Sequence, residues 1–259
     1  MKKLMLGNEA VARGLYEAGC CFVSSYPGTP STEITEAAAK YPEIYAEWAP
    51  NEKVAMEVAF GASLAGKRSF CAMKHVGLNV AADPLFTAAY VGVNAGLVVC
   101  VADDPAIHSS QNEQDSRFYA RSAHIPMLEP SDSAECYAMI QRAFELSEAY
   151  DTPVMLRLVT RIAHARSLVE KGERADLELR PYVKDAKKYV MMPGNAKRRH
   201  PVVEQRTAAL VQWAETAPVN RVENGRDTSM GIITSSTCYQ YVNCLLYTSP
   251  SPRDPKTSR

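Results

Sequence analysis

Glu52 is the side chain in this sequence best placed to do chemistry from a fixed position. It follows Asn51 and leads into residues 51–65, whose pattern predicts a helix rich in Ala, Gly and Ser. Asn51 can cap the free amides of that helix, which leaves Glu52 at the positive end of the helix dipole. Small residues let a helix approach its neighbour closely, so the carboxylate could be held at a fixed depth against a flat ligand. Acidic residues are also common in first helical turns, so the rest of the chain must decide between a structural and a functional role.

A second set of reactive side chains follows the apolar run at residues 96–103. Residues 103–121 read DDPAIHSSQNEQDSRFYAR and combine carboxylates, amides and arginines with His108. A polar segment this dense, directly after a buried strand, is expected either to be solvated or to line a site. A single histidine is more often structural, but the neighbours of His108 favour a substrate-facing loop.

The surrounding pattern predicts alternating strands and helices that bring these segments together. Helices are expected at residues 8–18, 51–65, 80–91 and 132–150, and one more begins at Pro30 after a Thr29 cap. Strands are expected at residues 20–25, 44–48, 68–74, 96–103 and 153–160. This alternation implies right-handed crossovers, so we predict an α/β fold with a doubly wound, mostly parallel sheet.

Ligands of such sheets bind outside the carboxyl ends of the strands, at a point where the strand order reverses. The loops that follow predicted strands are therefore expected to meet at one edge of the sheet. These loops are residues 26–31, 50–52, 74–79 and 103–121.

The composition divides the chain into four parts. Residues 1–165 form the predicted α/β domain, and residues 166–228 are a charged linker with one helix at 201–216. The basic cluster at 187–200 is expected to be a solvated connector rather than a phosphate site. Residues 229–242 read as the start of a second α/β domain, with a strand at 230–237. Residues 243–259 are proline-rich, cannot build a core and resemble translated sequencing-adapter text, so we interpret them as an artefact that truncates the protein.

The overall composition disfavours several classes of protein. Lysine plus arginine and aspartate plus glutamate both number 29, so no global field favours nucleic acid or an anionic membrane. No run approaches the ~20 apolar residues that span a bilayer, and the start of the chain turns polar too soon for a secretory signal. The 7 cysteines are irregularly spaced and form no disulfide framework, and Cys20, Cys21, Cys71 and Cys100 are expected to be buried free thiols. We therefore expect a cytoplasmic protein without nucleic-acid or membrane partners.

Four segments carry a resemblance to a known family, namely residues 26–33, 50–57, 73–85 and 103–121. They resemble the amino-terminal part of 2-oxoacid:ferredoxin oxidoreductases, and among these most of all the indolepyruvate:ferredoxin oxidoreductase alpha subunits. The similarity extends from residue 1 to about 242. It implies that residues 1–165 are the pyrimidine-binding domain of a thiamine diphosphate enzyme.

The resemblance implies roles for individual side chains. Glu52 matches the family's catalytic glutamate, which forms a hydrogen bond with N1′ of the cofactor's aminopyrimidine. Thr29 matches a threonine near both cofactor and substrate, and Arg121 matches an arginine that could pair with the substrate carboxylate. We add Asn79 to the cofactor-binding residues and His108 to the substrate-binding residues, because both follow strands at the predicted ligand edge. No metal ligand is predicted within this chain.

The resemblance also implies a reaction, cofactors and partners. The reaction is oxidative decarboxylation of an aryl pyruvate to an aryl-acetyl-coenzyme A, with electrons passed to ferredoxin and with a beta subunit as partner. Magnesium and iron–sulfur clusters would accompany thiamine diphosphate. The sequence contains neither a Gly-Asp-Gly…Asn motif nor clustered Cys-x-x-Cys, so regions outside this chain are expected to bind both, and the fragment alone is expected to be inactive.

Two alternatives remain open at this point. One is the same chemistry on another 2-oxoacid, since no pocket residue that enforces an aryl preference can be named. The other is a non-catalytic α/β module used for subunit assembly. A Rossmann dehydrogenase is disfavoured because no Gly-x-Gly-x-x-Gly follows a predicted strand.

Overall fold

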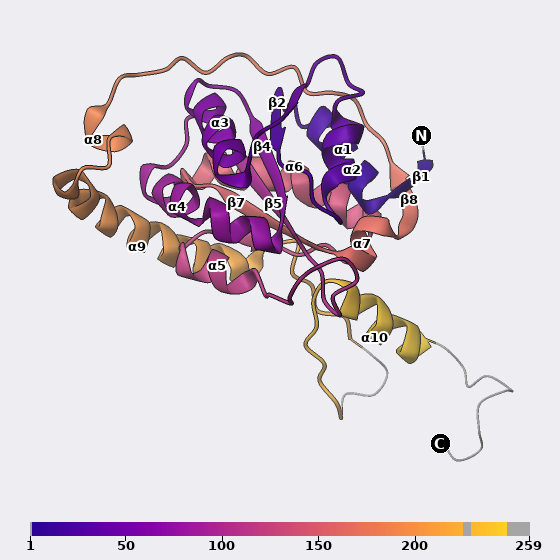
Figure 1. Cartoon of the computed structure of the whole chain (residues 1–259). Helices are drawn as coiled ribbons and strands as arrows, with labels where there is room; N and C mark the ends of the chain where they lie inside the picture. Colours follow the sequence, from indigo (N-terminus) through magenta and orange to yellow (C-terminus); the bar gives the residue numbers. More distant parts are fainter. Residues whose placement is uncertain (1, 225–228, 248–259) are drawn as a thin grey trace, which may run out of the picture.

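A computed structural model describes residues 2–224 and 229–247, and a six-stranded parallel sheet lies at its centre (Figure 1). The strand order is β3-β2-β4-β5-β7-β6, and every neighbouring pair is parallel. The strands are β2 (Phe22–Ser25), β3 (Tyr45–Trp48), β4 (Ser69–Lys74), β5 (Leu97–Asp103), β6 (Met127–Leu128) and β7 (Val154–Val159). The chain runs outward from β2 to β3 and then returns past β2 to β4. The strand order therefore reverses between β2 and β4, and the predicted doubly wound fold is confirmed.

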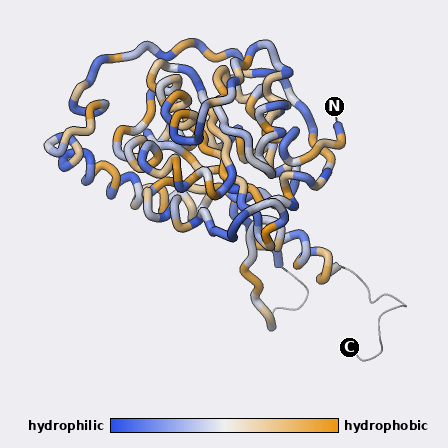
Figure 2. Tube along the Cα trace, viewed as in Figure 1, coloured by the Kyte–Doolittle hydropathy of each residue, from blue (hydrophilic) through white to orange (hydrophobic). Residues whose placement is uncertain are grey.

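Helices cover both faces of this sheet. One face carries α1 (Gly7–Glu17), α2 (Thr32–Ala38) and α6 (Ser133–Tyr150), and the other carries α3 (Glu52–Leu64), α4 (His75–Val91) and α5 (Arg117–Ser122). Strand β5 shows why both faces need cover. Its side chains alternate between the two cores, with Val98 and Cys100 in one and Val99 and Val101 in the other. Hydrophobic residues accordingly follow the central strands in Figure 2.

The chain after β7 returns to its own beginning. A short α7 (Thr160–His164) leads into β8 (Arg166–Glu170), which pairs antiparallel with β1 (Lys2–Leu6) in a separate two-stranded sheet. Neither strand was predicted, because each is short and weakly alternating. Their pairing joins the start of the predicted linker to the first residues of the chain.

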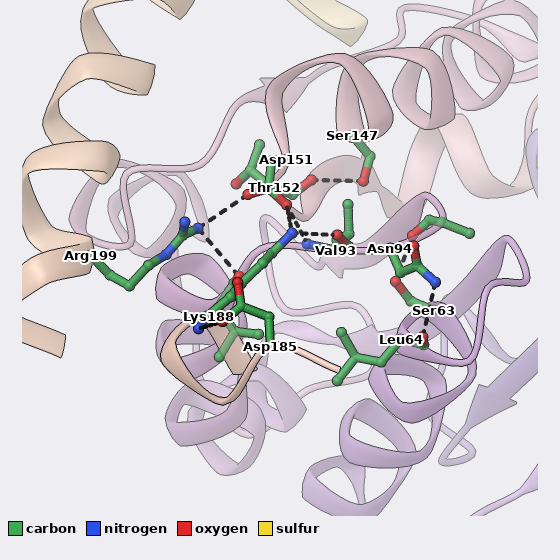
Figure 3. A network of polar contacts seen from close by, with 12 residues as sticks. Ser63, Leu64, Val93, Asn94, Ser147, Asp151, Thr152, Asp185, Lys188 and Arg199 are labelled. Atoms are coloured by element: carbon green, nitrogen blue, oxygen red, sulfur yellow. Dashed lines mark hydrogen bonds and ion pairs between the residues drawn. The ribbon is translucent and has the colours of Figure 1, made fainter. Parts of the chain in front are cut away.

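The basic cluster at residues 187–200 is only in part the predicted solvated connector, because most of its residues are exposed but Lys188 and Arg199 contact the domain. After α8 (Ala186–Tyr189), helix α9 (Pro193–Thr216) begins eight residues before the expected helix and packs along α4. Its Arg199 donates to the Tyr90 carbonyl and to Asp151, and Lys188 also contacts Asp151 (Figure 3). The basic residues fasten this segment to the domain, because carbonyls at the end of α4 lack helical partners and accept from them.

Two helix starts also differ from the predictions. Helix α2 begins at Thr32 rather than at Pro30, because residues 28–32 first form a tight turn. In that turn the Gly28 amide donates to Thr32 Oγ1, and the Ser31 amide donates to the Gly28 carbonyl. Helix α4 begins at His75, although it has no side-chain cap that would mark this start in the sequence.

The predicted strand at residues 230–237 does not form. Residues 230–235 have no regular structure, and α10 (Thr237–Tyr247) follows them. A strand needs a neighbour to receive its hydrogen bonds, and in the described part of the chain this segment has none. The first five residues of the supposed tail belong to α10, and residues 248–259 lie outside the described residues.

Candidate functional site

Three loops meet where β2, β4 and β5 end, and Lys74 lies between two of them. A Cβ built on Gly28 would lie 3.6 Å from the Cβ of Lys74, so the loop after β2 packs along the lysine stem. The Lys74 ammonium donates to the Ser109 carbonyl at 2.6 Å, in the loop after β5. The loops that were expected to share the carboxyl edge of the sheet therefore do so, at the point where the strand order reverses.

Glu52 is fixed at this same edge by two local features. The Asn51 side chain accepts from the Val54 amide at 3.0 Å, as the predicted cap requires, and α3 starts at Glu52. A Cβ built on Gly77 would lie 2.5 Å from Glu52 Oε1, so the carboxylate rests against the bare Cα of Gly77 in the first turn of α4. Any larger residue at position 77 would push the carboxylate away.

The charge of Glu52 also affects the pKa of a thiol inside the sheet. Burial raises the pKa of the Cys71 thiol, and the neighbouring Cys100 and the Glu52 carboxylate raise it further. Cys71 lies in β4, next to the switch point. Glu52 itself is half-buried.

Asp104 organises the loop that follows β5. Its carboxylate is buried and accepts from Ser109 N at 2.7 Å, from Ser110 Oγ at 2.6 Å and from Thr160 Oγ1 at 2.7 Å. Burial favours the protonated carboxyl, but these hydrogen bonds outweigh it and hold the pKa of Asp104 well below its usual range. The loop is therefore built around a fixed negative charge.

The neighbouring Asp103 ties the other end of the loop to β7. It accepts from the Ser116 amide at 3.1 Å and from Arg157 Nε at 2.7 Å. Arg157 also donates to Glu129 at 2.6 Å, and all of these groups are buried or nearly so. Asp103 and Asp104 together anchor both ends of the loop.

The side chain of His75 contacts the middle of the loop that follows β5. Its side chain is fully buried, and Nε2 lies 3.1 Å from the Asn112 carbonyl. Since a carbonyl can only accept, Nε2 carries the proton and Nδ1 is left as an acceptor. No described group donates to that Nδ1.

The predicted site residues lie around this edge but do not all touch one another. Thr29 is exposed in the loop beside Lys74, and Asn79 is exposed on α4 and accepts from the Tyr119 hydroxyl on α5. The side chains of His108 and Arg121 are exposed and have no hydrogen bond or ion pair within the described residues. No contact joins either of them to Glu52.

The orientation of α5 separates Arg121 from the Asn79 contact. Residues two positions apart on a helix point about 200° apart, so Arg121 projects away from the side on which Tyr119 meets Asn79.

Three residues of this edge escaped individual notice in the sequence, namely Lys74, His75 and Gly77. They were grouped into a loop at residues 74–79, because the helix was expected to begin at Val80. The uncommon string KHVG directly after a strand was the available signal, but only the packing against Glu52 gives Gly77 its meaning.

A hollow of about 330 Å³ lies against the same loop and is lined by Pro105, Glu113, Gln114, Asp115, Arg117 and Arg157. Neither Glu52 nor Lys74 lines it. Its two arginines are already paired with carboxylates, Arg117 with Asp115 and Arg157 with Asp103. We therefore place the ligand site at the switch point rather than in this hollow.

Within residues 2–224 and 229–247, no group of three or more His, Cys, Asp and Glu side chains is arranged to hold a metal ion. In the same residues no helix has the length and apolar character needed to cross a membrane. Cys20, Cys71 and Cys100 are buried free thiols, as expected from the sequence, whereas Cys21 is only partly buried and the buried Cys136 was not predicted.

The fold and this edge together define a doubly wound domain that presents a fixed carboxylate at its switch point. The family described as "Pyruvate flavodoxin/ferredoxin oxidoreductase, thiamine diP-bdg" matches residues 13–227. The chain therefore belongs to the thiamine diphosphate-binding family of the pyruvate flavodoxin/ferredoxin oxidoreductases.

Curated relatives narrow the similarity further. The chain is 46% identical over 246 residues to the indolepyruvate oxidoreductase subunit IorA of Methanothermobacter thermautotrophicus, and 42% identical over 249 residues to that of Archaeoglobus fulgidus. These alignments cover 93% of this chain and 40% of each relative. The 2-oxoglutarate synthase subunit KorA of M. thermautotrophicus is more distant, with 30% identity over 184 residues, 67% of this chain and 49% of that relative. The chain thus spans about 40% of the length of the IorA relatives.

A solved structure supports the fold. The chain resembles the 2-oxoglutarate:ferredoxin oxidoreductase from Magnetococcus marinus, solved with 2-oxoglutarate, coenzyme A and succinyl-CoA bound, with a TM-score of 0.68. The sequences are 20% identical, and the match covers 82% of this chain and 45% of that chain. At this identity the likeness establishes the architecture alone.

Proposed function

We propose that this chain is the pyrimidine-binding part of a thiamine diphosphate-dependent oxidoreductase that acts on aryl pyruvates such as indolepyruvate. The reaction is oxidative decarboxylation to an aryl-acetyl-coenzyme A, with reduction of ferredoxin. The observation that carries the proposal is the carboxylate of Glu52, fixed at the switch point against the bare Cα of Gly77. The identity of 46% to an indolepyruvate oxidoreductase subunit, against 30% to a 2-oxoglutarate synthase subunit, supports the aryl substrate.

The residues present fit the pyrimidine half of the cofactor. A flat heteroaromatic ring needs a carboxyl group held in one position where it can form a hydrogen bond to a ring nitrogen. Because Gly77 has no side chain, the Glu52 carboxylate can occupy a position directly against the Gly77 Cα. In our proposal Glu52 holds a proton between its Oε and N1′ of the aminopyrimidine. Thr29 and Asn79, exposed at the same edge, are the further residues that we assign to the cofactor.

The bound cofactor would supply a nucleophilic carbon and an electron sink for decarboxylation. The protein's own part is to orient and to exclude water. The loop built on Asp103 and Asp104 would cover the substrate and present His108 to it. Thr29 would contact the substrate from the loop after β2, and Arg121 is the arginine that we assign to the substrate side.

The remaining components belong to the whole enzyme. We propose that magnesium and iron–sulfur clusters are bound by regions that the relatives have and this chain does not span, and that a beta subunit, ferredoxin and coenzyme A complete the assembly. Residues 1–165 would be the pyrimidine-binding domain, followed by a linker at 166–228. The free thiols suit a reducing, cytoplasmic location. The chain by itself would be inactive.

The test uses the full-length subunit assembled with its partner and cofactors. Indolepyruvate-dependent, coenzyme A-dependent reduction of ferredoxin is expected, with a higher kcat/KM for indolepyruvate than for pyruvate or 2-oxoglutarate. A higher kcat/KM for another 2-oxoacid would support the proposed reaction type but contradict indolepyruvate as the substrate. A protein that neither binds thiamine diphosphate nor turns over any 2-oxoacid would instead be a non-catalytic assembly module.

A further inference from the structure

The ammonium of Lys74 occupies the centre of the candidate site. Its aliphatic stem packs along Gly28 in the loop after β2, and its head reaches the Ser109 carbonyl in the loop after β5. Three residues further on, Gly77 touches Glu52. The lysine and the glutamate therefore flank one edge of the sheet, on either side of the start of α4.

This ammonium differs from the other cations near the loop in what it contacts. Arg117 and Arg157 pair with carboxylates, but Lys74 has no carboxylate within 4.0 Å among the described residues. Its single protein partner is a neutral carbonyl. A lysine ammonium has three donors, so two of them remain available. The positive end of the α4 dipole lies at the same place and favours an anion there.

The substrate class of the proposed function carries a matching anion. In a 2-oxoacid the carboxylate is bonded directly to the carbon that reacts, so the cation that receives it must lie beside the cofactor. Lys74 ends β4 three positions before Gly77, and its ammonium reaches the loop after β5, so it lies at the strand ends where Glu52 contacts Gly77. Arg121 lies on the side of α5 away from the Asn79 contact, and within the described residues no hydrogen bond or ion pair links it to this edge.

We propose that Lys74 binds the carboxylate of the 2-oxoacid substrate while it still holds the Ser109 carbonyl. The inference rests on the proposed function and assigns to Lys74 a role that the sequence had suggested for Arg121. Binding would thereby couple the substrate to the position of the loop built on Asp104. Because the carboxylate loses its charge when carbon dioxide leaves, this contact is stronger before the reaction than after it. Removal of the charge should then raise KM more than it lowers kcat.

The experiment compares charge variants of Lys74 in the assembled enzyme. Lys74→Met removes the charge and the hydrogen bond, and Lys74→Gln removes the charge but can still donate to the Ser109 carbonyl. A hydrogen bond between charged groups contributes roughly 1.5–3 kcal/mol, so the KM for the 2-oxoacid should rise about 10- to 100-fold in both variants. Lys74→Arg should recover most of the affinity.

A second readout separates charge recognition from a structural role. Aryl-lactate and its primary amide have nearly the same shape, cannot be decarboxylated and differ in charge. Wild-type enzyme should bind the acid at least 10-fold more tightly than the amide. In Lys74→Met and Lys74→Gln this ratio should fall to about 1, since a merely loosened loop would weaken both inhibitors alike.

Two control variants test whether the ratio of acid to amide affinity reports the charge of Lys74 alone. Lys53→Met removes an exposed cation one residue from Glu52, where it pairs with Asp83, and should leave the ratio unchanged. Ser110→Ala loosens the loop at Asp104 and should weaken both inhibitors without changing their ratio. A ratio that persists in Lys74→Gln and disappears in Arg121→Met would overturn the inference. Wild-type enzyme that turns over no 2-oxoacid would instead refute the proposed function.

Discussion

At the edge of the sheet where β5 and β7 begin, polar groups are paired with one another, whereas at the opposite edge several are not. Asp151 accepts from the Val93 amide at 2.9 Å, from Lys188 at 2.8 Å and from Arg199 at 3.1 Å (Figure 3). Arg206 is buried beside them and donates to two main-chain carbonyls, although its Nε has no partner. This cluster fastens α8 and α9 to the domain.

The edge where β4 and β5 end has a different character. Lys74 has no carboxylate partner, Nδ1 of the buried His75 has no donor, and the side chains of His108 and Arg121 have no partner within the described chain. Of these groups only His75 is buried, whereas Lys74 is half-buried and His108 and Arg121 are exposed. The polar network at the first edge holds α8 and α9 on the domain, and we propose that the groups at the second edge face a ligand.

The change with the largest expected effect is Glu52→Gln. It keeps the shape of the side chain but cannot hold the shared proton, and general acid–base groups of this kind contribute roughly 10²- to 10⁴-fold to rate. Turnover should fall by about that factor in the assembled enzyme, together with hydrogen–deuterium exchange at C2 of the bound cofactor. Thermal stability should change little. Near-normal exchange in the variant would refute the role of Glu52.

Gly77→Ala should have the next largest effect. The new Cβ would lie 2.5 Å from Glu52 Oε1 and would displace the carboxylate from the cofactor side. We expect kcat to fall about 10- to 100-fold, since a small misplacement of a catalytic group has such a cost. Gly61→Ala in α3 is the matched control, because a Cβ there meets nothing within 4 Å. It should leave activity unchanged and stabilise the helix by about 0.5–1 kcal/mol. Normal activity of Gly77→Ala would mean that Glu52 is not held by this contact.

Gly92→Ala makes the corresponding change at the opposite edge. Gly92 has φ of 81°, and a Cβ there would collide with the Asp151 carboxylate. Residues forced into this region cost of order 1–3 kcal/mol, so the free energy of unfolding of this chain should fall by about that much in urea titrations. The activity per folded assembled enzyme should stay the same. A loss of kcat without a loss of stability would contradict the division between the two edges.

The smallest expected effect is a pH dependence at Asp104. Its folded-state pKa lies below its unfolded value, so its ionised form stabilises the fold above about pH 4, and this contribution is lost as the pH falls toward the folded pKa. Asp104→Asn should cost about 1.5 kcal/mol at pH 7, the low end of the range for hydrogen bonds to a charged group, because the asparagine oxygen can still accept. Urea titrations should show that the difference in unfolding free energy between wild type and Asp104→Asn narrows between pH 5 and pH 3. A difference in unfolding free energy that stays constant with pH would show that the charge of Asp104 contributes nothing to stability.

Much of the fold could be predicted because its signals are local. The buried run at residues 97–103 and the Asn51 cap with Glu52 at the helix start follow from hydrophobic pattern and hydrogen-bonding chemistry over a few neighbouring residues. The start of α4 and the pairing of β1 with β8 could not be predicted in this way. The helix has no capping side chain, and the two paired strands lie at opposite ends of the domain's sequence.

The candidate site was predictable only in part, for the same reason. The loops could be assigned to one edge because the carboxyl ends of parallel strands share it. Their contacts could not, since Glu52 and Gly77 are 25 positions apart and Lys74 and Ser109 are 35 apart. The placement of Arg121 on the side of α5 away from the Asn79 contact is likewise a matter of helix orientation.

By itself, the sequence determined the alternation of strands and helices, the capped helix that begins at Glu52, and the polar loop after β5. These depend on backbone preferences and on the spacing of apolar residues. Only the tertiary structure decided that Gly77 would hold the Glu52 carboxylate, that Lys74 would remain without a carboxylate partner, and that Arg199 would be fixed by Asp151. The physical reason is that strand order and helix packing, which no short window of sequence contains, choose the neighbours of each side chain.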